Sequence, residues 1–157
     1  MKKKPLFAES TTVPVSNSIR EIQELLVQAG ATSINLNFSG TGSVTGLAFL
    51  IPYGKNGNSI PYKLPVRTAA VAAKFDSRRQ EAHPFNANKW KEKDREQAER
   101  IAWRQLYWWL KSQLALIELG MVETAEVLMP YCVGANGLTL WEAYRPKMIA
   151  GPETSKP

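Results

Sequence analysis

The segment at residues 91–120, KEKDREQAERIAWRQLYWWLKSQLALIELG, limits the folds open to this chain more strongly than any other. It holds three of the five tryptophans, and its apolar residues recur at the spacing of one helix face. The pattern predicts one long helix from about Lys89 to Gly120, where the glycine ends it. On a helical wheel the apolar residues fill a band roughly 160° wide, broader than an ordinary amphipathic stripe. A band of that width must be buried, so the rest of the chain has to cover it.

Before this segment the apolar spacing is first that of a helix and then that of strands. In VSNSIREIQELLVQAGA, Ser18 and Glu21 have the spacing of a capping box and Gly30 supplies a stop, which predicts a short amphipathic helix. SINLNFSG, VTGLAFLIPY and IPYKLPV are apolar runs separated by turn residues, which predicts a three-stranded antiparallel meander. Pro61 and Pro65 remove two ladder donors from the third run and place it at a sheet edge.

The remaining segments predict further helices and a turn. RTAAVAAKFDSRRQEA is rich in alanine and free of glycine and proline, which predicts a helix that ends before Pro84. After the long helix, MVETAEVLMP predicts a short helix closed by Pro130, and YCVGANGLTLWEAY predicts a small hairpin around Asn136 and Gly137. The predicted fold class is therefore α+β: a helix, a three-stranded antiparallel meander, long helices packed on one face, and a small C-terminal hairpin.

The length of the chain predicts one domain. A chain of 157 residues with 44% apolar residues can bury one core but is short for two ordinary domains. The polar, proline-containing ends predict disordered tails at residues 1–10 and 146–157, which leaves a single α+β domain at residues 11–145. No apolar run approaches the length of a membrane span, and the single cysteine, Cys132, excludes an internal disulfide. We therefore expect a cytoplasmic protein that does not bind membranes, and its oligomeric state stays open.

The sequence offers few groups for catalysis. His83 and Cys132 are the only residues of their kinds, and one of each cannot supply a zinc site or a Ser-His-Asp set. SGTGSVTG leads into a predicted strand, whereas phosphate-binding glycine loops lead into a helix N-terminus, so this segment predicts a hairpin turn. The predicted strands contain no acid, and the acids at the start of the long helix suit its dipole. We therefore expect a protein that is not an enzyme and that uses no metal or cofactor.

The net charge of +6 is concentrated in the middle of the chain. Residues 61–118 carry 12 basic and 7 acidic side chains, whereas residues 1–60 carry 5 and 3 and residues 119–157 carry 3 and 4. On the wheel of the long helix, a set of cations falls within about 40° on the side away from the apolar band. We call this set the basic row: Lys93, Arg100, Arg104 and Lys111. A basic surface of this kind favours nucleic acid or another polyanion as the ligand.

Two interpretations of the basic row stay open. Its cations either form a solvated helix face and pair with acids such as Glu96 and Glu99, or they contact phosphates through charge and counterion release. Trp108 lies away from the apolar band, so it is either covered by another element or exposed beside the cations, where Trp108 or Tyr107 could stack on a base. The predicted nucleic-acid-binding residues are Lys89, Lys91, Lys93, Arg100, Arg104, Tyr107, Trp108, Lys111, Arg78 and Arg79.

The order of a helix, three antiparallel strands and a long helix resembles that of double-stranded-RNA-binding domains. The resemblance runs from SIREIQELLVQAG to WRQLYWWL, over residues 18–110. In that family, lysines at the start of the last helix contact phosphates, and Lys89, Lys91 and Lys93 match them in position. The resemblance implies nucleic-acid binding, although the alanine-rich segment at residues 67–82 is an addition to the order of elements in the family.

Two further stretches, TTVPVSNSIREIQELLVQAGA and QLALIELGMVETAEVLMPYCVGANGLTLWEAY, resemble small proteins of bacteriophages and mobile elements that have no known activity. Together these observations predict a small non-enzymatic nucleic-acid-binding protein of such an origin, with DNA and RNA not distinguished. The alternative is a protein-binding module, for instance an inhibitor of a host complex that presents the same basic face to an acidic host protein. Binding to random oligonucleotides that weakens with salt separates the first interpretation from the second.

Overall fold

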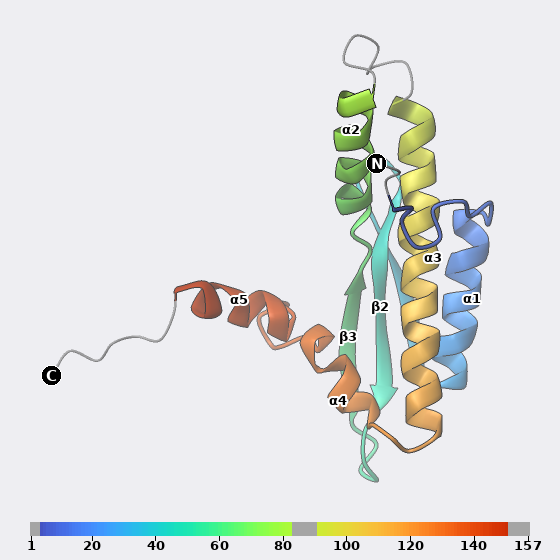
Figure 1. Ribbon diagram of the computed structural model, residues 1–157. Helices are drawn as coiled ribbons and strands as arrows, with labels where there is room; N and C mark the ends of the chain where they lie inside the picture. Colours follow the sequence, from blue (N-terminus) through green and yellow to red (C-terminus); the bar gives the residue numbers. More distant parts are fainter. Residues whose placement is uncertain (1–3, 83–90, 151–157) are drawn as a thin grey trace, which may run out of the picture. The chain divides into compact units, whose positions relative to one another are not determined.

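The computed structural model describes residues 4–82 and 91–150 (Figure 1). In chain order its elements are α1 (Val15–Gln28), β1 (Ser33–Phe38), β2 (Val44–Pro52), β3 (Ser59–Pro65), α2 (Thr68–Ala82), α3 (Lys91–Glu118), α4 (Thr124–Leu128), the 3-10 helix η2 (Met129–Tyr131) and α5 (Leu140–Ala150). The strands form one antiparallel sheet in the order β1-β2-β3. This order confirms the predicted α+β class, with a helix and a meander before a long helix.

The chain divides into two compact units, and each is assembled from two stretches of sequence. Unit 1 comprises Met1–Gln28 and Pro65–Ala115, which hold α1, α2 and most of α3. Unit 2 comprises Ala29–Leu64 and Leu116–Pro157, which hold the sheet, the end of α3, α4, η2 and α5. The range 11–145, which the sequence predicts to be a single domain, is thus shared between both units. Length does not reveal this division, because it depends on which elements contact one another.

The sheet of unit 2 buries alternate residues of its central strand. Leu47, Phe49 and Ile51 of β2 are buried, as the two-residue period of a strand requires. β1 pairs with β2 in an antiparallel register that sets Leu36 opposite Leu47 and Ile34 opposite Phe49. The alternation that predicts these strands therefore also identifies the apolar face of the sheet.

β3 lies at one edge of the sheet, as its two prolines predict. Its Tyr62 is buried, and the ring stacks on that of Phe49 with 5.5 Å between the ring centroids. A short C-terminal segment pairs with β3: Tyr62 forms a bridge with Cys132, and the Val133 N–H donates to the Pro61 carbonyl at 2.9 Å. This pairing satisfies backbone groups that an open sheet edge leaves exposed.

The predicted C-terminal hairpin is reduced to a single bridge pair. Val133 and Thr139 form an isolated antiparallel bridge, and α5 begins at Leu140, where the sequence predicts a second strand. The reason is a capping box, in which the Thr139 N–H donates to Glu142 Oε2 at 2.8 Å and the Glu142 N–H donates to Thr139 Oγ1 at 3.2 Å. These bonds fix the first turn of a helix, which continues through residues 146–150 of the predicted C-terminal tail.

α1 begins earlier than the sequence predicts. It starts at Val15, and the Pro14 carbonyl accepts the N–H groups of Asn17 at 3.1 Å and Ser18 at 3.2 Å. Ser18 is therefore not an N-cap but a buried residue inside the helix, and its Oγ has no hydrogen-bond partner among the described residues. The capping-box interpretation of Ser18 and Glu21 is wrong, because Pro14 already supplies the first acceptor.

The core of unit 1 contains residues from α1 and α3, which lie side by side in Figure 1. α3 buries Ala98, Trp103 and Leu110, all members of the predicted apolar band, and α1 buries Ile22 and Leu26. A buried aromatic side chain removes about 150–250 Å² from water. At about 25 cal/mol per Å², Trp103 is one of the largest single apolar contributions in the unit.

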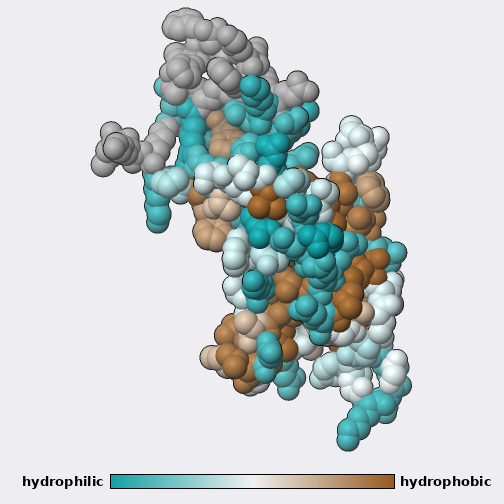
Figure 2. Space-filling model, turned by 90° about the vertical axis from the view of Figure 1, so that its right-hand side faces the viewer, coloured by the Kyte–Doolittle hydropathy of each residue, from teal (hydrophilic) through white to brown (hydrophobic). Residues whose placement is uncertain are grey.

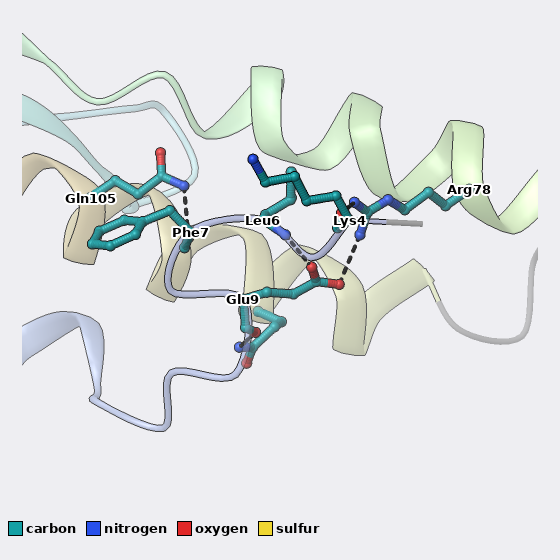
Figure 3. Close-up of polar contacts among 7 residues, drawn as sticks. Lys4, Leu6, Phe7, Glu9, Arg78 and Gln105 are labelled. Atoms are coloured by element: carbon teal, nitrogen blue, oxygen red, sulfur yellow. Dashed lines mark hydrogen bonds and ion pairs between the residues drawn. The ribbon is translucent and has the colours of Figure 1, made fainter. Parts of the chain in front are cut away.

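The described part of the predicted N-terminal tail contacts α2 (Figure 3). Arg78 of α2 forms an ion pair with Glu9 at 2.8 Å, and its second nitrogen donates to the Lys4 carbonyl at 2.9 Å. The Leu6 N–H also donates to the Glu9 carboxylate. The pKa of Glu9 lies below its ordinary value of 4.5, because the Leu6 N–H and then Arg78 stabilise the carboxylate more than desolvation destabilises it.

Two glutamines of α3 hold the same segment through its carbonyls. Gln97 donates at 2.9 Å to the carbonyls of Glu9 and Thr11, and Gln105 donates at 2.9 Å to that of Phe7. The sequence predicts a disordered tail here because the segment lacks apolar periodicity. Its order comes instead from side chains that lie 69 to 98 positions later in the chain.

Candidate nucleic-acid interface

Four neighbouring residues of α3 form what we call the cation-aromatic cluster: Arg104, Tyr107, Trp108 and Lys111. Their i, i+3, i+4 and i+7 spacing sets them on one face of the helix. Arg104 Cζ lies 4.1 Å from the Tyr107 ring centroid and 5.6 Å from that of Trp108, and for Lys111 Nζ the distances are 5.6 and 5.3 Å. The two rings meet edge to face, 5.3 Å apart at 68°. Each ring is therefore within cation–π distance of both cations.

Trp108 is the exposed member of the aromatic pair. It is 41% exposed, which agrees with the second interpretation of this residue, that it is exposed beside the cations. Phe7 and Val27 of unit 1 are more exposed, at 65% and 62%, and Figure 2 shows apolar residues between hydrophilic ones over one face of the molecule. Exposure alone thus does not distinguish Trp108, because single exposed apolar residues are normal. Its distinguishing feature is the pair of cations beside its ring.

Arg104 is engaged within the protein. Its Nη1 forms a short ion pair with Glu21 Oε2 of α1, and its side chain is only 13% exposed. Its guanidinium also lies over the Tyr107 ring. A cation that is so covered and paired has little capacity left for a phosphate. The geometry therefore favours a positioning role for Arg104 over the predicted role of a phosphate ligand.

Arg100 is also paired, but at the surface. Its side chain is 35% exposed, its Nη2 lies 3.7 Å from Glu96 Oε2, and its Nη1 donates to Gln97 Oε1 at 2.9 Å. This is the pairing with nearby acids that the sequence leaves open as an alternative for the basic row. Lys93 is exposed near the start of α3.

Lys111 is the cation of the cluster that remains available to an external ligand. Its ammonium group is exposed and donates to Tyr107 Oη at 3.3 Å. In the described part of the chain, its contacts are with this hydroxyl and with the Tyr107 and Trp108 rings, and none is with a carboxylate. Its charge is therefore compensated less than that of Arg104.

The other predicted basic residues are either engaged elsewhere or lie outside what the structure describes. Arg78 is engaged by Glu9 and by the backbone of the N-terminal segment (Figure 3). Lys89 lies outside the described residues, as do the side chains of Arg79 and Lys91. The lysine set that the resemblance to double-stranded-RNA-binding domains implies therefore stays a prediction.

The pairing that organises the site is missed by sequence reasoning. Glu21 lies 83 positions before Arg104, and its spacing from Ser18 predicts a capping box instead. A helical wheel of α3 shows which cations share a face, but it does not show which acids of other elements lie opposite them. No local pattern signals this ion pair.

The geometry of the side chains is the guide to the function of this chain. Among the residues that the structure describes, no three His, Cys, Asp or Glu side chains are placed to hold a metal ion. None of the described helices is both long and apolar enough to cross a membrane. Searches against protein-family models, curated proteins and solved structures find no match to this chain. The resemblances that the sequence suggests therefore stay predictions.

Proposed function

We propose that this protein binds single-stranded nucleic acid through the cation-aromatic cluster of α3, without catalysing a reaction. The observation that supports this function is the exposed Trp108 ring with the Lys111 ammonium 5.3 Å from its centroid. Proteins that bind single strands combine aromatic rings, on which bases stack, with cations that follow the phosphates. Paired bases stack on one another and offer no free face in a duplex, so the cluster suits unpaired bases.

Each member of the cluster has a distinct role in this proposal. Trp108 stacks on the base, and Lys111 contacts the adjacent phosphate. Tyr107 supports the Trp108 ring edge to face, and Arg104 holds Tyr107 through its guanidinium. Glu21 anchors Arg104 to α1. The platform is therefore formed before the ligand arrives, which lowers the entropic cost of binding.

The pairing of the arginines limits the electrostatic part of the affinity. For single strands, log affinity falls against log salt with a slope of about 0.7 per neutralised phosphate. Four phosphate contacts by the whole basic row correspond to a slope of about 2.8. Because Arg100 and Arg104 are paired with Glu96 and Glu21, we expect the slope of the row to be clearly below 2.8, and the exposed Lys111 accounts for about 0.7 of it.

The test is the binding of a fluorescent oligothymidylate, followed by anisotropy. Trp108→Ala should lose about 1–3 kcal/mol of binding free energy, and Lys111→Ala should lower the salt slope by about 0.7. The matched controls are Tyr53→Ala and Lys55→Ala, which remove an exposed ring and an exposed cation from the turn after β2 and should change neither quantity. Equal affinity of the parent and the Trp108→Ala variant would contradict the proposal.

A second function, binding of an acidic protein by the same face, is favoured by the mixture of charges beside the cluster. Glu96 is exposed next to Arg100 and repels a phosphate chain, in which every unit is negative, whereas a mostly acidic protein surface can place a basic side chain opposite it. This function requires that the parent does not bind oligonucleotides and that it binds a purified acidic host protein. Trp108→Ala should then weaken the protein complex while Tyr53→Ala leaves it unchanged.

A further inference from the structure

α5 is a helix that exposes most of its large apolar side chains. None of its residues is buried, and four of its large apolar side chains are exposed: Trp141, Tyr144, Met148 and Ile149. Single exposed apolar residues are normal, but several on one short helix mark an interaction surface. These residues lie in unit 2 and are separate from the cluster on α3, so the inference does not rest on the proposed function.

Three of these side chains line up on one face of α5. Trp141, Tyr144 and Met148 follow the i, i+3 and i+7 spacing, which sets them within about 60° of one another around the helix. We call them the α5 stripe. Anchors at this spacing are those with which an amphipathic helix fills a groove on a partner.

The start of α5 is built into unit 2 by specific hydrogen bonds. The capping box between Thr139 and Glu142 fixes the first turn, and Thr139 is buried. The Leu140 N–H donates to the Cys132 carbonyl at 2.9 Å, and Cys132 pairs with Tyr62 of β3. The stripe is thus presented on a preformed helix, which reduces the ordering cost of association.

The charges around the stripe indicate the chemistry of the partner. Arg145 and Lys147 are exposed on α5, and Lys147 Nζ lies 5.6 Å from the Tyr144 ring centroid. The acid of the helix, Glu142, is engaged in the capping box. The stripe therefore has positive charge beside it, which complements an acidic surface. We propose that α5 is a docking helix, which inserts the α5 stripe into an apolar groove with an acidic rim on a partner protein.

Two other occupants fit these observations less well. If the stripes of two copies paired, Arg145 and Lys147 of each helix would approach like charges, which opposes association. A helix that lies on a membrane surface needs a broad apolar face and many cations. The α5 stripe spans only about 60°, and the helix carries two cations, Arg145 and Lys147.

The test uses the full chain and calcium-loaded calmodulin, an acidic protein that opens an apolar groove for basic amphipathic helices. Titration calorimetry of the parent should give a one-to-one complex. Trp141→Ala should weaken it at least about tenfold, as the loss of a central aromatic anchor does. Arg145→Glu combined with Lys147→Glu should also weaken it, whereas Tyr53→Ala, an exposed ring outside α5, should not.

Thermal melts of the Tyr53→Ala and charge-reversal variants should coincide with that of the parent, because those side chains are exposed. Trp141 is 39% exposed, so the melt of the Trp141→Ala variant has to show that it is folded at the temperature of the titration. Three outcomes overturn the proposal. The first is no heat of binding to calmodulin at protein concentrations of about 100 μM, or binding that the α5 variants leave unchanged. The second is a concentration-dependent dimer of the parent that Trp141→Ala abolishes, which assigns the stripe to a second copy. The third is binding to anionic phospholipid vesicles that the same variants weaken, which assigns it to a membrane.

Discussion

At the scale of single residues, partners decide what each polar group contributes to stability. Ser18 is buried, and its hydroxyl has no hydrogen-bond partner among the described residues. Arg104 is mostly covered and has a carboxylate partner in Glu21. An unpaired buried hydroxyl costs about 1–3 kcal/mol, whereas removal of one member of a covered ion pair leaves the other uncompensated. Substitutions of these two residues should therefore change stability in opposite directions.

Ser18→Ala should leave the free energy of unfolding unchanged or raise it by up to about 1 kcal/mol, because alanine removes the unsatisfied hydroxyl. Ser16→Ala, at an exposed position of α1, is the control and should have little effect. Urea denaturation measures both. A loss of about 1 kcal/mol at Ser18, typical of a removed N-cap, would restore the capping-box interpretation.

Arg104→Ala should lower the free energy of unfolding by about 1–2 kcal/mol, because it leaves Glu21 unpaired in a partly buried position. Arg20→Ala is the control, because it breaks the exposed 2.6 Å pair of Arg20 with Glu24. It should lower the free energy of unfolding by less than about 1 kcal/mol. A double-mutant cycle with Glu21→Gln isolates the coupling of Arg104 and Glu21. Similar couplings for the covered and the exposed pair would show that burial does not strengthen the first.

At the scale of elements, α3 carries tryptophans with opposite roles. Trp103 is buried and Trp108 is exposed, although they lie five positions apart on the same helix. Trp103→Ala should cost about 3–5 kcal/mol, as the truncation of a core aromatic does. Trp108→Ala should cost less, about 1 kcal/mol, since the ring is 41% exposed and loses mainly its edge-to-face contact with Tyr107. A large loss of stability in the Trp108→Ala variant would mean that this ring belongs to the core.

The N-terminal segment should detach from α2 and α3 in acid. Because the folded pKa of Glu9 lies below 4.5, its carboxylate form favours attachment, and this stabilisation is present above the unfolded pKa. It is lost as the pH falls through the lowered, folded value. Nuclear magnetic resonance relaxation at Leu6 and Phe7 should therefore report greater motion at low pH. In the Glu9→Gln variant the motion should be greater at neutral pH and nearly independent of pH, and a parent segment equally rigid in acid would contradict this account.

Local patterns predict the helices and strands of this chain better than they predict the contacts between distant residues. Spacing identifies α1, α3 and the strands, because each buries one face with its own period, whereas α2 is predicted from its alanine content. The glycine turn before Thr139 predicts a hairpin, although Thr139 and Glu142 also have the spacing of a capping box. In the structure the capping box forms and begins α5. No local pattern reports contacts between residues that lie 83 or 98 positions apart. The sequence therefore does not predict the ion pair of Arg104 with Glu21 or the hydrogen bond of Gln105 to the Phe7 carbonyl.

At the scale of the whole molecule, the two units carry separate candidate surfaces. Unit 1 carries the cation-aromatic cluster, and unit 2 carries the α5 stripe. The net charge of +6 predicts a polyanion ligand, but in unit 1 the arginines at positions 78, 100 and 104 are paired with acids of the same unit. A count of charges therefore overstates the basic face. The function that we propose depends on the exposed ring of Trp108 and on Lys111 more than on the row as a whole.

The contact between Trp108 and a base can be observed directly in protein labelled with fluorotryptophan. The Trp108 resonance is identified by its absence from a Trp108→Phe variant, and the buried Trp103 serves as the internal control. On titration with a single-stranded oligothymidylate, we expect the Trp108 fluorine resonance to shift in step with binding, while that of Trp103 stays in place. Saturable binding with an unmoved Trp108 resonance, or no binding at all, would contradict the proposed interface.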